Sequence, residues 1–547
     1  MAELREKNYL KGAAILAASA VVSKLVGALF KIPLYNLLGT DGTAHFNKTY
    51  QIYTLLLAIS YSGIPVALSR LISAAAETGR TRQIARYHRV ALPAFAVVGA
   101  IVSALMLLFA PQLADFIKDP QATAGIRALS PAVLLCCIVS VYEGYSQGHG
   151  NMLPTAIKQF LEVTCKLVFG MAAAIILLRY GADSETTAAG AITGSVAGLA
   201  VALPVLIAYK RRRERRLAAA GDTGGSGDLK SARATLAEIF KVSLPVTLGA
   251  SFMSILTLLD SRLVSDRLEF SGLSHADAIS KFGIYSQCHT LFIFPPSLIS
   301  AVTVSVLPAI SAAVAGKRRG EARGITESAL KLVCLIAMPA AVGISVLSGP
   351  IFKTLYGVSP AAADGARILT VLGAASFFAC TQLLTTAALQ ANGLERVPML
   401  SFVAGGAAQL TLDYILVGNG SIGIIGSPIG TLVCYAVITA VNLIVIKLKT
   451  PEPPRVVRTA VRPLIISAVM GVAAFSVHGL VQKLIGGSLG SGRAAEAVAL
   501  LPTIAIAVII YAVLAVASRA ITRADLKYVP KGDRIADILH LPREKNQ

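Results

Sequence analysis

The chain has 547 residues, of which 55% are hydrophobic and only 14% are charged. Soluble globular domains carry roughly 25% charged residues, so this composition excludes an ordinary soluble protein and indicates many membrane spans. The formal net charge of +21 would suggest nucleic acid in a soluble chain. Here nearly all of the excess lies in short segments between apolar runs, so we expect no nucleic-acid partner.

Apolar runs follow one another along the whole chain, and each approaches the roughly 20 residues needed to cross a bilayer. Lys and Arg concentrate in alternate connecting segments, which is typical of cytoplasmic loops. We therefore predict an all-α polytopic protein of the plasma membrane, with both termini inside the cell. The 14 predicted spans are 12–36, 48–69, 89–110, 124–146, 153–178, 188–209, 237–262, 282–307, 328–349, 364–390, 398–417, 424–447, 461–485 and 495–518.

The first apolar run carries Lys24 near its middle and Lys31 two helical turns further on, so both lie on one helix face. A cation at mid-membrane costs on the order of 2.5–3.5 kcal/mol and usually faces a cavity or a partner. A cationic cavity suits an anionic substrate. Lys31 precedes Pro33, where we expect the helix to bend or end, so Lys31 either lines the cavity or reaches the membrane surface. Because the lysines interrupt the run, we interpret it as an uncleaved first helix.

Two apolar runs contain helix-breaking residues. The second ends with Gly63 and Pro65, followed by Arg70, and the eighth contains Pro295 and Pro296. Such residues free backbone groups, which is tolerated where neighbours or a water-filled cavity satisfy them. The glycine and the three prolines are therefore candidate hinges, with static kinks as the alternative. Arg70 is either a substrate ligand or a cytoplasmic anchor.

The fifth run carries Lys158, Glu162 and Lys166 at intervals of one helical turn. This spacing places all three on one face, with Glu before Lys in the better orientation for pairing. We expect Glu162 and Lys166 to neutralise each other. The pair either joins helices as a structural element or takes part in substrate binding or ion coupling.

The seventh run contains Asp260 and Arg262, which are two residues apart and do not face each other on a helix. Each therefore needs another partner. Arg262 either completes a cationic cluster with Lys24 across the centre of the protein or reaches the outer surface from the helix end. Asp260 is grouped with Glu162 and Lys166 as a coupling or structural residue.

The longest predicted cytoplasmic loop divides the chain into halves that resemble weak parallel repeats. Residues 72–75 and 310–313 both read Ile-Ser-Ala-Ala and close matching spans, and Gly194 matches Gly430. Substrate sites of repeat transporters lie between the repeats near mid-bilayer. The predicted parts are an N-terminal lobe at 1–209, a basic cytoplasmic linker at 210–236, a C-terminal lobe at 237–449, two extra spans at 450–518 and a cytoplasmic tail at 519–547.

The chain shows no sequence motif of a hydrolase, an ATPase or a redox enzyme. The seven cysteines all fall in predicted spans without a CxxC pair, so neither a disulfide framework nor a metal centre is expected. We therefore expect a secondary transporter rather than an enzyme, without a cofactor. Its drive would be the membrane potential, H⁺ or Na⁺ coupling, or downstream consumption of the product.

Several short motifs occur in the order seen in the stage V sporulation protein B type of polysaccharide exporter. The chain resembles that family, which lies in the multidrug/oligosaccharidyl-lipid/polysaccharide (MOP) flippase superfamily and is related to MurJ-type lipid II flippases. The resemblance covers essentially the whole chain. Its motifs lie at 23–27, 31–34, 37–39, 50–53, 63–65, 142–148, 151–155 and 389–393.

The resemblance implies two six-helix lobes in a V shape with two added C-terminal helices, in a bacterial plasma (inner) membrane. It implies a lipid-linked anionic substrate such as lipid II, a polyprenyl pyrophosphate bearing sugars. In MurJ-type flippases an Arg follows Ser where this chain has Ser23 and Lys24, so Lys24 would bind pyrophosphate. Glu143 stands where the family often has Arg, and the further Arg of span two has no clear counterpart.

Two alternatives to a flippase remain. A cation-coupled multidrug exporter of the MATE type needs acids in its cavity, and the cationic first span argues against it. A non-transporting scaffold for wall-synthesis enzymes, which are candidate partners, would need the basic linker rather than Lys24. For the flippase, the predicted substrate ligands are Lys24 and Arg262, followed by Lys31 and Arg70.

Overall fold

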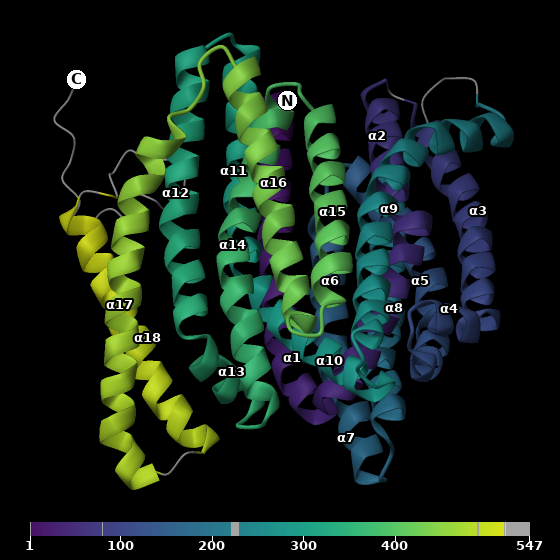
Figure 1. Ribbon diagram of the computed structural model, residues 1–547. Helices are drawn as coiled ribbons and strands as arrows, with labels where there is room; N and C mark the ends of the chain where they lie inside the picture. The colour runs from purple at the N-terminus through teal and green to yellow at the C-terminus, as the bar shows by residue number, and fades with distance from the viewer. Residues whose placement is uncertain (1, 79, 220–228, 490–491, 519, 521–547) are drawn as a thin grey trace. The chain divides into compact units, whose positions relative to one another are not determined.

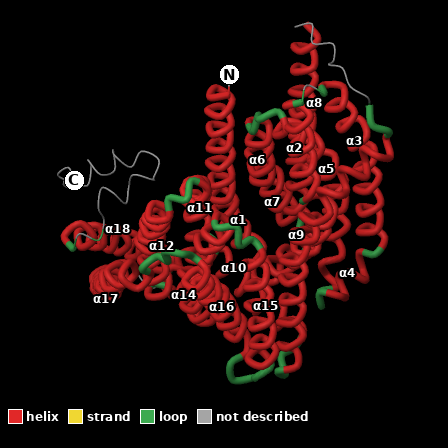
Figure 2. The backbone as a smooth tube through the Cα atoms, turned by 90° about the horizontal axis from the view of Figure 1, so that it is seen from above, coloured by secondary structure: helices red, strands yellow, loops and turns green. Residues whose placement is uncertain are grey.

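The computed structural model describes the chain except residues 1, 79, 220–228, 490–491, 519 and 521–547. In the described part every regular element is a helix and no strand occurs (Figure 2). Twelve described helices are long and apolar enough to cross a membrane. The chain is therefore an all-α multi-pass membrane protein, as predicted, while the exact count of 14 spans stays a prediction.

The helices form two compact units. Unit 1 comprises Met1–Asp266 and His275–Gly283, and unit 2 comprises Arg267–Ser274 and Ile284–Gln547. Unit 1 holds α1 (Ala2–Tyr61), α2 (Gly63–Glu77), α3 (Thr81–Leu108), α4 (Ala110–Phe116), η1 (Pro120–Ala122), α5 (Thr123–Gly148), α6 (Leu153–Cys165), η2 (Lys166–Gly170), α7 (Met171–Arg179), α8 (Ser184–Ala219), most of α9 (Ala232–Phe270) and the first half of α10 (His275–Phe292) (Figure 1).

Unit 2 holds the remaining helices. Within this unit α12 packs against α11, α14 and α17, and α17 packs against α18 (Figure 1). The helices are α11 (Phe294–Ala315), α12 (Arg319–Val346), α13 (Ser348–Tyr356), α14 (Ala361–Ala391), α15 (Arg396–Val417), η3 (Gly423–Ile425), α16 (Gly426–Lys449), α17 (Val456–Leu489) and α18 (Arg493–Ala517).

A single glycine joins the first two predicted spans. We expected the first helix to bend or end near Pro33, but Pro33 lies inside α1 and the break comes at Gly39, with φ 68° and ψ −169°. Proline is tolerated within a membrane helix, whereas a left-handed φ is readily adopted only by Gly. The predicted loop between these spans is therefore absent, and the helix is interrupted at Gly39 alone.

Gly39 allows a direct test of this break. Nothing lies within 4 Å of a Cβ added at Gly39 or at Gly27, so only the backbone distinguishes the two positions. We expect Gly39→Ala to destabilise the protein by about 1–2 kcal/mol because φ is positive there. Gly27→Ala, in the regular part of α1, should leave stability unchanged or raise it. Thermal unfolding of both variants checks this, and equal midpoints would contradict the assigned break.

The internal repeat is visible in the turns that follow α2 and α11. The Arg80 amide donates to the Ala75 carbonyl, and the Arg318 amide donates to the Ala313 carbonyl, each at 2.9 Å. Helices α3 and α12 then begin one residue later in the two halves. The repeated Ile-Ser-Ala-Ala sequence therefore closes equivalent turns.

Both predicted helix breaks are confirmed. One residue separates α1 from α2, just before Gly63, and one residue separates α10 from α11. A Cβ on Gly63 would lie 2.3 Å from the Ser243 carbonyl oxygen of α9, so this break is closely packed. Pro295 and Pro296 occupy the first turn of α11, where proline is tolerated. The role of these residues, and of Pro65, as hinges stays a prediction.

The basic segment that follows the sixth predicted span is helical. It continues α8 as far as Ala219, and α9 begins at Ala232. The Gly-rich middle of the predicted linker, 220–228, and the tail at 519–547, apart from residue 520, lie outside the described residues. All seven cysteines are buried and free.

Candidate functional site

Two charged residues face each other across the hairpin between α5 and α6. Glu143 precedes the α5–α6 turn by about as many residues as Lys158 follows it, so both reach the same depth. The Lys158 ammonium lies 3.9 Å from the Glu143 carboxylate, and their side chains are 9% and 2% exposed. Buried charges of this kind must be paired, because an isolated one costs several kcal/mol.

The same ammonium forms a closer pair on its own helix. Lys158 Nζ lies 3.0 Å from Glu162 Oε2. The expected ion pair of Glu162 therefore forms with Lys158 rather than with Lys166. The Tyr61 hydroxyl at the end of α1 donates to a Glu143 oxygen at 2.7 Å. Lys158 thus pairs with two carboxylates, and Tyr61 from a third helix hydrogen-bonds to one of them, Glu143.

Lys166 continues the stripe two turns beyond Lys158. Its ammonium donates to the Tyr50 hydroxyl at 2.8 Å and lies 4.8 Å from the centre of the Tyr50 ring. Lys166 is also the first residue of η2, a short π-helix inside the membrane span. Such π segments often occur at functional sites. The bulge therefore changes the register of the helix at this cation.

Glycines on α8 allow that helix to support the stripe from behind. A Cβ on Gly194 would lie 2.6 Å from the Gly170 amide nitrogen and 3.0 Å from the Lys166 carbonyl oxygen. A Cβ on Gly198 would lie 2.9 Å from the Glu162 Cα atom. The backbones therefore touch, as small residues permit between membrane helices, and the positions of Glu162 and Lys166 depend on these glycines.

We call Glu143, Lys158, Glu162 and Lys166 the α5–α6 charge cluster. Its two carboxylates and two ammonium groups balance, so the cluster adds no net charge to the membrane. Glu162 is 22% exposed, more than Lys158 or Glu143.

The predicted cations of span one lie on the helix beside this cluster. Ser19 Oγ of α1 donates to the Ala156 carbonyl oxygen of α6 at 3.1 Å. Lys24 follows Ser19 by about 7.5 Å of helix rise, and its side chain lies outside the described residues. Lys31 is half-buried, with its ammonium 5.9 Å from the Tyr35 ring centre.

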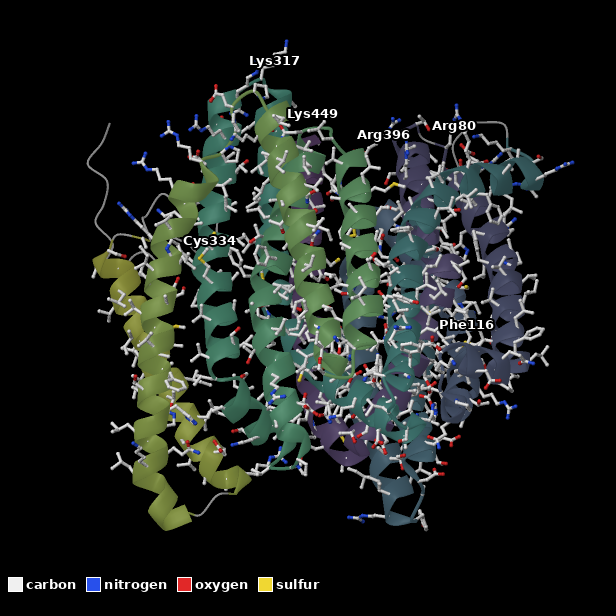
Figure 3. All side chains as sticks on the ribbon, in the orientation of Figure 1. Arg80, Phe116, Lys317, Cys334, Arg396 and Lys449 are labelled. Carbon is white, nitrogen blue, oxygen red and sulfur yellow. The ribbon has the colours of Figure 1, made fainter. Side chains whose placement is uncertain are left out.

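The structure separates Arg70 from Arg262. Arg262 lies 4.4 Å from the ring centre of Phe116, which shortly precedes α5 (Phe116 is labelled in Figure 3). Arg70 is exposed on α2, next to residues that pack against Gly148 at the other end of α5. Phe116 and Gly148 therefore mark opposite ends of α5, and even two-thirds of this helix would span about 25 Å. One pyrophosphate therefore cannot contact both arginines in this conformation.

Asp260 lies half-buried on α9, the helix that also carries Arg262. The end of this helix is held by an ion pair between Lys118 and Asp266 at 3.0 Å. The role of Asp260 as a coupling or structural residue together with Glu162 and Lys166 stays a prediction.

The sequence interpretation did not assign Glu143, Tyr50 or Tyr61. For Glu143 the missed signal was geometric, because residues equidistant from a tight helical turn lie at equal depth. Tyr50 and Tyr61 belong to the part of α1 that follows the Gly39 break, and nothing in their spacing indicated which charged groups they would meet.

A family model described as polysaccharide biosynthesis protein matches residues 9–314, more than half of the chain. The chain is 25% identical over 531 residues to stage V sporulation protein B of Bacillus subtilis (strain 168), covering 96% of this chain and 98% of the relative. It is also 25% identical over 522 residues to lipid II flippase MurJ of the same strain, covering 92% and 94%.

Solved structures show the same fold. An inward closed conformation of lipid II flippase MurJ superposes with a TM-score of 0.67 at 13% identity, covering 91% of this chain and 98% of that chain. An inward-facing MATE family multidrug resistance transporter of the MOP superfamily superposes with a TM-score of 0.62 at 15% identity, covering 78% and 96%. At these identities the likeness shows the fold.

Proposed function

The chain belongs to the polysaccharide biosynthesis protein family, and we propose that it moves a polyprenyl-pyrophosphate-linked glycan precursor across the bacterial plasma (inner) membrane. Lipid II or a related wall precursor is the substrate class. Similarity to proteins named as a lipid II flippase and a sporulation protein supports the proposal. The basic connecting segments favour an orientation with both termini in the cytoplasm.

The observation that carries the proposal is the charge of the first span. Lys24 and Lys31 lie on α1, and no acidic residue occurs between Glu6 and Asp41. The neighbouring α5–α6 charge cluster is balanced within itself, because its two carboxylates are matched by the ammonium groups of Lys158 and Lys166. The surplus cations of α1 therefore suit a pyrophosphate, which lysine binds as a point charge.

Transport would proceed by alternating access, with bends at Gly63 and Pro65 and at the Pro-Pro pair of α11. Arg70 and Arg262, near opposite ends of α5, would meet the substrate at different stages rather than together. An ion gradient or the membrane potential would supply the drive, since the sequence shows no ATPase motif.

Replacement of Lys24 tests the site. In vesicles containing dye-labelled lipid II, we expect Lys24→Ala to flip the lipid about 10- to 100-fold more slowly than wild type, because a bond to a charged partner is worth roughly 1.5–3 kcal/mol. Lys24→Arg should stay within a few-fold of wild type. The control is Lys241→Ala, which removes an exposed lysine of α9. Flipping by Lys24→Ala at the wild-type rate would refute the assigned site.

A further inference from the structure

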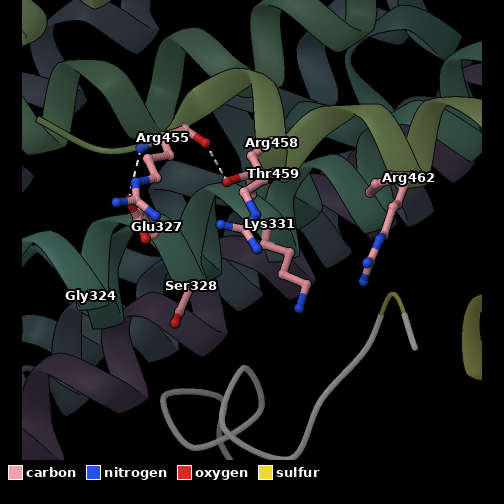
Figure 4. Close-up of a pocket in the computed structure, with 9 residues that line it drawn as sticks. Gly324, Glu327, Ser328, Lys331, Arg455, Arg458, Thr459 and Arg462 are labelled. Carbon is pink, nitrogen blue, oxygen red and sulfur yellow. Dashed lines mark hydrogen bonds between the residues drawn. The ribbon is translucent and has the colours of Figure 1, made fainter. Parts of the chain in front are cut away.

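A cavity in unit 2 lies between α12 and the start of α17. Its volume is about 390 Å³, and its lining includes Lys331 of α12 together with Arg455, Arg458 and Arg462 (Figure 4). Glu327 is the one acidic residue among the described lining residues. None of the residues assigned to transport lines this cavity.

The acid of the cavity is already neutralised. The Arg323 Nε–H donates to Glu327 Oε1 at 3.0 Å, and the backbone N–H of Arg455 donates to the same oxygen at 2.8 Å. A carboxylate is thus held at the N-terminus of α17, where the helix dipole favours negative charge. Four cationic residues line the cavity against this one acid, so the cavity as a whole attracts an anion.

The cavity lies at the level where a membrane helix meets water. Arg458 begins the candidate span Arg458–Leu484, and Arg462 follows one turn later. Lys317 and Lys449, which precede α12 and end α16, lie at the same end of unit 2 (Figure 3). This is the depth of lipid phosphates rather than of acyl chains.

An apolar stripe continues from the two arginines along α17. Ile465, Val469 and Val472 follow Arg458 and Arg462 at alternating steps of three and four residues, which keeps all five on one helix face. The three apolar side chains are 59%, 49% and 70% exposed, and both arginines are exposed. The face therefore presents cations near its end and an apolar surface below them.

We propose that this cavity binds the phosphate of an anionic glycerophospholipid, with its acyl chains along Ile465, Val469 and Val472. Basic pockets between membrane helices bind such headgroups. A phosphoglycerol headgroup suits a cavity of about 390 Å³, whereas a pyrophosphate carrying sugars is bulkier. The site lies apart from the α5–α6 charge cluster in the sequence and does not depend on the identity of the transported substrate.

Lipid-dependent stability tests the site. The purified protein is titrated in neutral detergent with phosphatidylglycerol or phosphatidylcholine, and bound lipid is counted by native mass spectrometry. Unfolding is followed with a thiol-reactive dye, for which the seven buried cysteines are suited. We expect phosphatidylglycerol to bind at least about tenfold more tightly than phosphatidylcholine and to raise the unfolding midpoint of the protein. In Arg458→Gln/Arg462→Gln its affinity should fall about 30-fold.

The control is Arg82→Gln/Arg89→Gln, which removes two exposed arginines from the first turns of α3. It should bind phosphatidylglycerol like wild type. The single change Lys331→Gln should also weaken binding of phosphatidylglycerol. It replaces the double variant in the test if the double variant does not fold. Equal binding of the two lipids by wild type, unchanged binding by the cavity variants, or an equal loss in the control would overturn the site. Tenfold tighter binding of polyprenyl phosphate would overturn the assignment to a glycerophospholipid.

Discussion

Replacing Lys158 by Met is expected to destabilise the protein by about 3–5 kcal/mol, the usual result of breaking a buried ion pair from one side. Lys158 is the ammonium that both Glu143 and Glu162 approach, at 3.9 and 3.0 Å. Without it, two carboxylates remain in the membrane, and the Glu143 carboxylate keeps the hydrogen bond from Tyr61. Thermal unfolding followed with the thiol-reactive dye measures the loss.

Charge removal should reverse most of this loss. Adding Glu143→Gln to Lys158→Met leaves one carboxylate, Glu162, and one ammonium group, Lys166, so the double variant should unfold at a higher temperature than the single one. Arg318→Met is the matched surface change, because its ion pair with Glu321 is 58% and 45% exposed. It should cost at most about 1 kcal/mol. A Lys158 variant as stable as Arg318→Met would show that the cluster is not charged as described.

Gly194→Ala is expected to produce the second large effect, a destabilisation of about 1–3 kcal/mol through overpacking. The added Cβ would meet the Gly170 nitrogen at 2.6 Å and its Cα at 2.8 Å, and these backbone atoms cannot rotate away. The π-helix η2 would have to shift, and Lys166 with it. Flipping should therefore slow along with the loss in unfolding temperature.

Gly249→Ala is the matched control for this change. Gly249 lies within helix α9, where nothing is within 4 Å of an added Cβ. Alanine there should leave stability unchanged or raise it by up to about 1 kcal/mol. If both alanine variants behave alike, α8 and η2 do not approach each other this closely in the membrane.

Much of the fold follows from local patterns in the sequence. Apolar length predicted the helices, and the Ile-Ser-Ala-Ala repeats predicted equivalent turns after α2 and α11. Pro295 and Pro296 predicted the break before α11. Pro33 misled the prediction because a proline can stay within a membrane helix, whereas the break needs the positive φ that Gly39 supplies.

The site was harder to predict because its contacts join different helices. The stripe on α6 was evident, yet its spacing fits Lys158 with Glu162 as well as Glu162 with Lys166. Glu143, on the other arm of the hairpin, lies close to Lys158 and completes the cluster there. Periodicity alone cannot show which residues of neighbouring helices share a depth, since that depends on how the helices pack.

The most direct test of the central claim compares two substrates in the same vesicles. Wild-type protein is reconstituted with dye-labelled lipid II, and the accessible headgroup is measured against time alongside uptake of a fluorescent organic cation, with and without an imposed potential or pH gradient. We predict headgroup exchange at least about tenfold faster than in protein-free vesicles, the effect of lowering the barrier by roughly 1.4 kcal/mol, and no uptake of the cation. Accumulation of the cation without lipid exchange would identify a drug exporter, and movement of neither would favour a scaffold; either result contradicts the flippase.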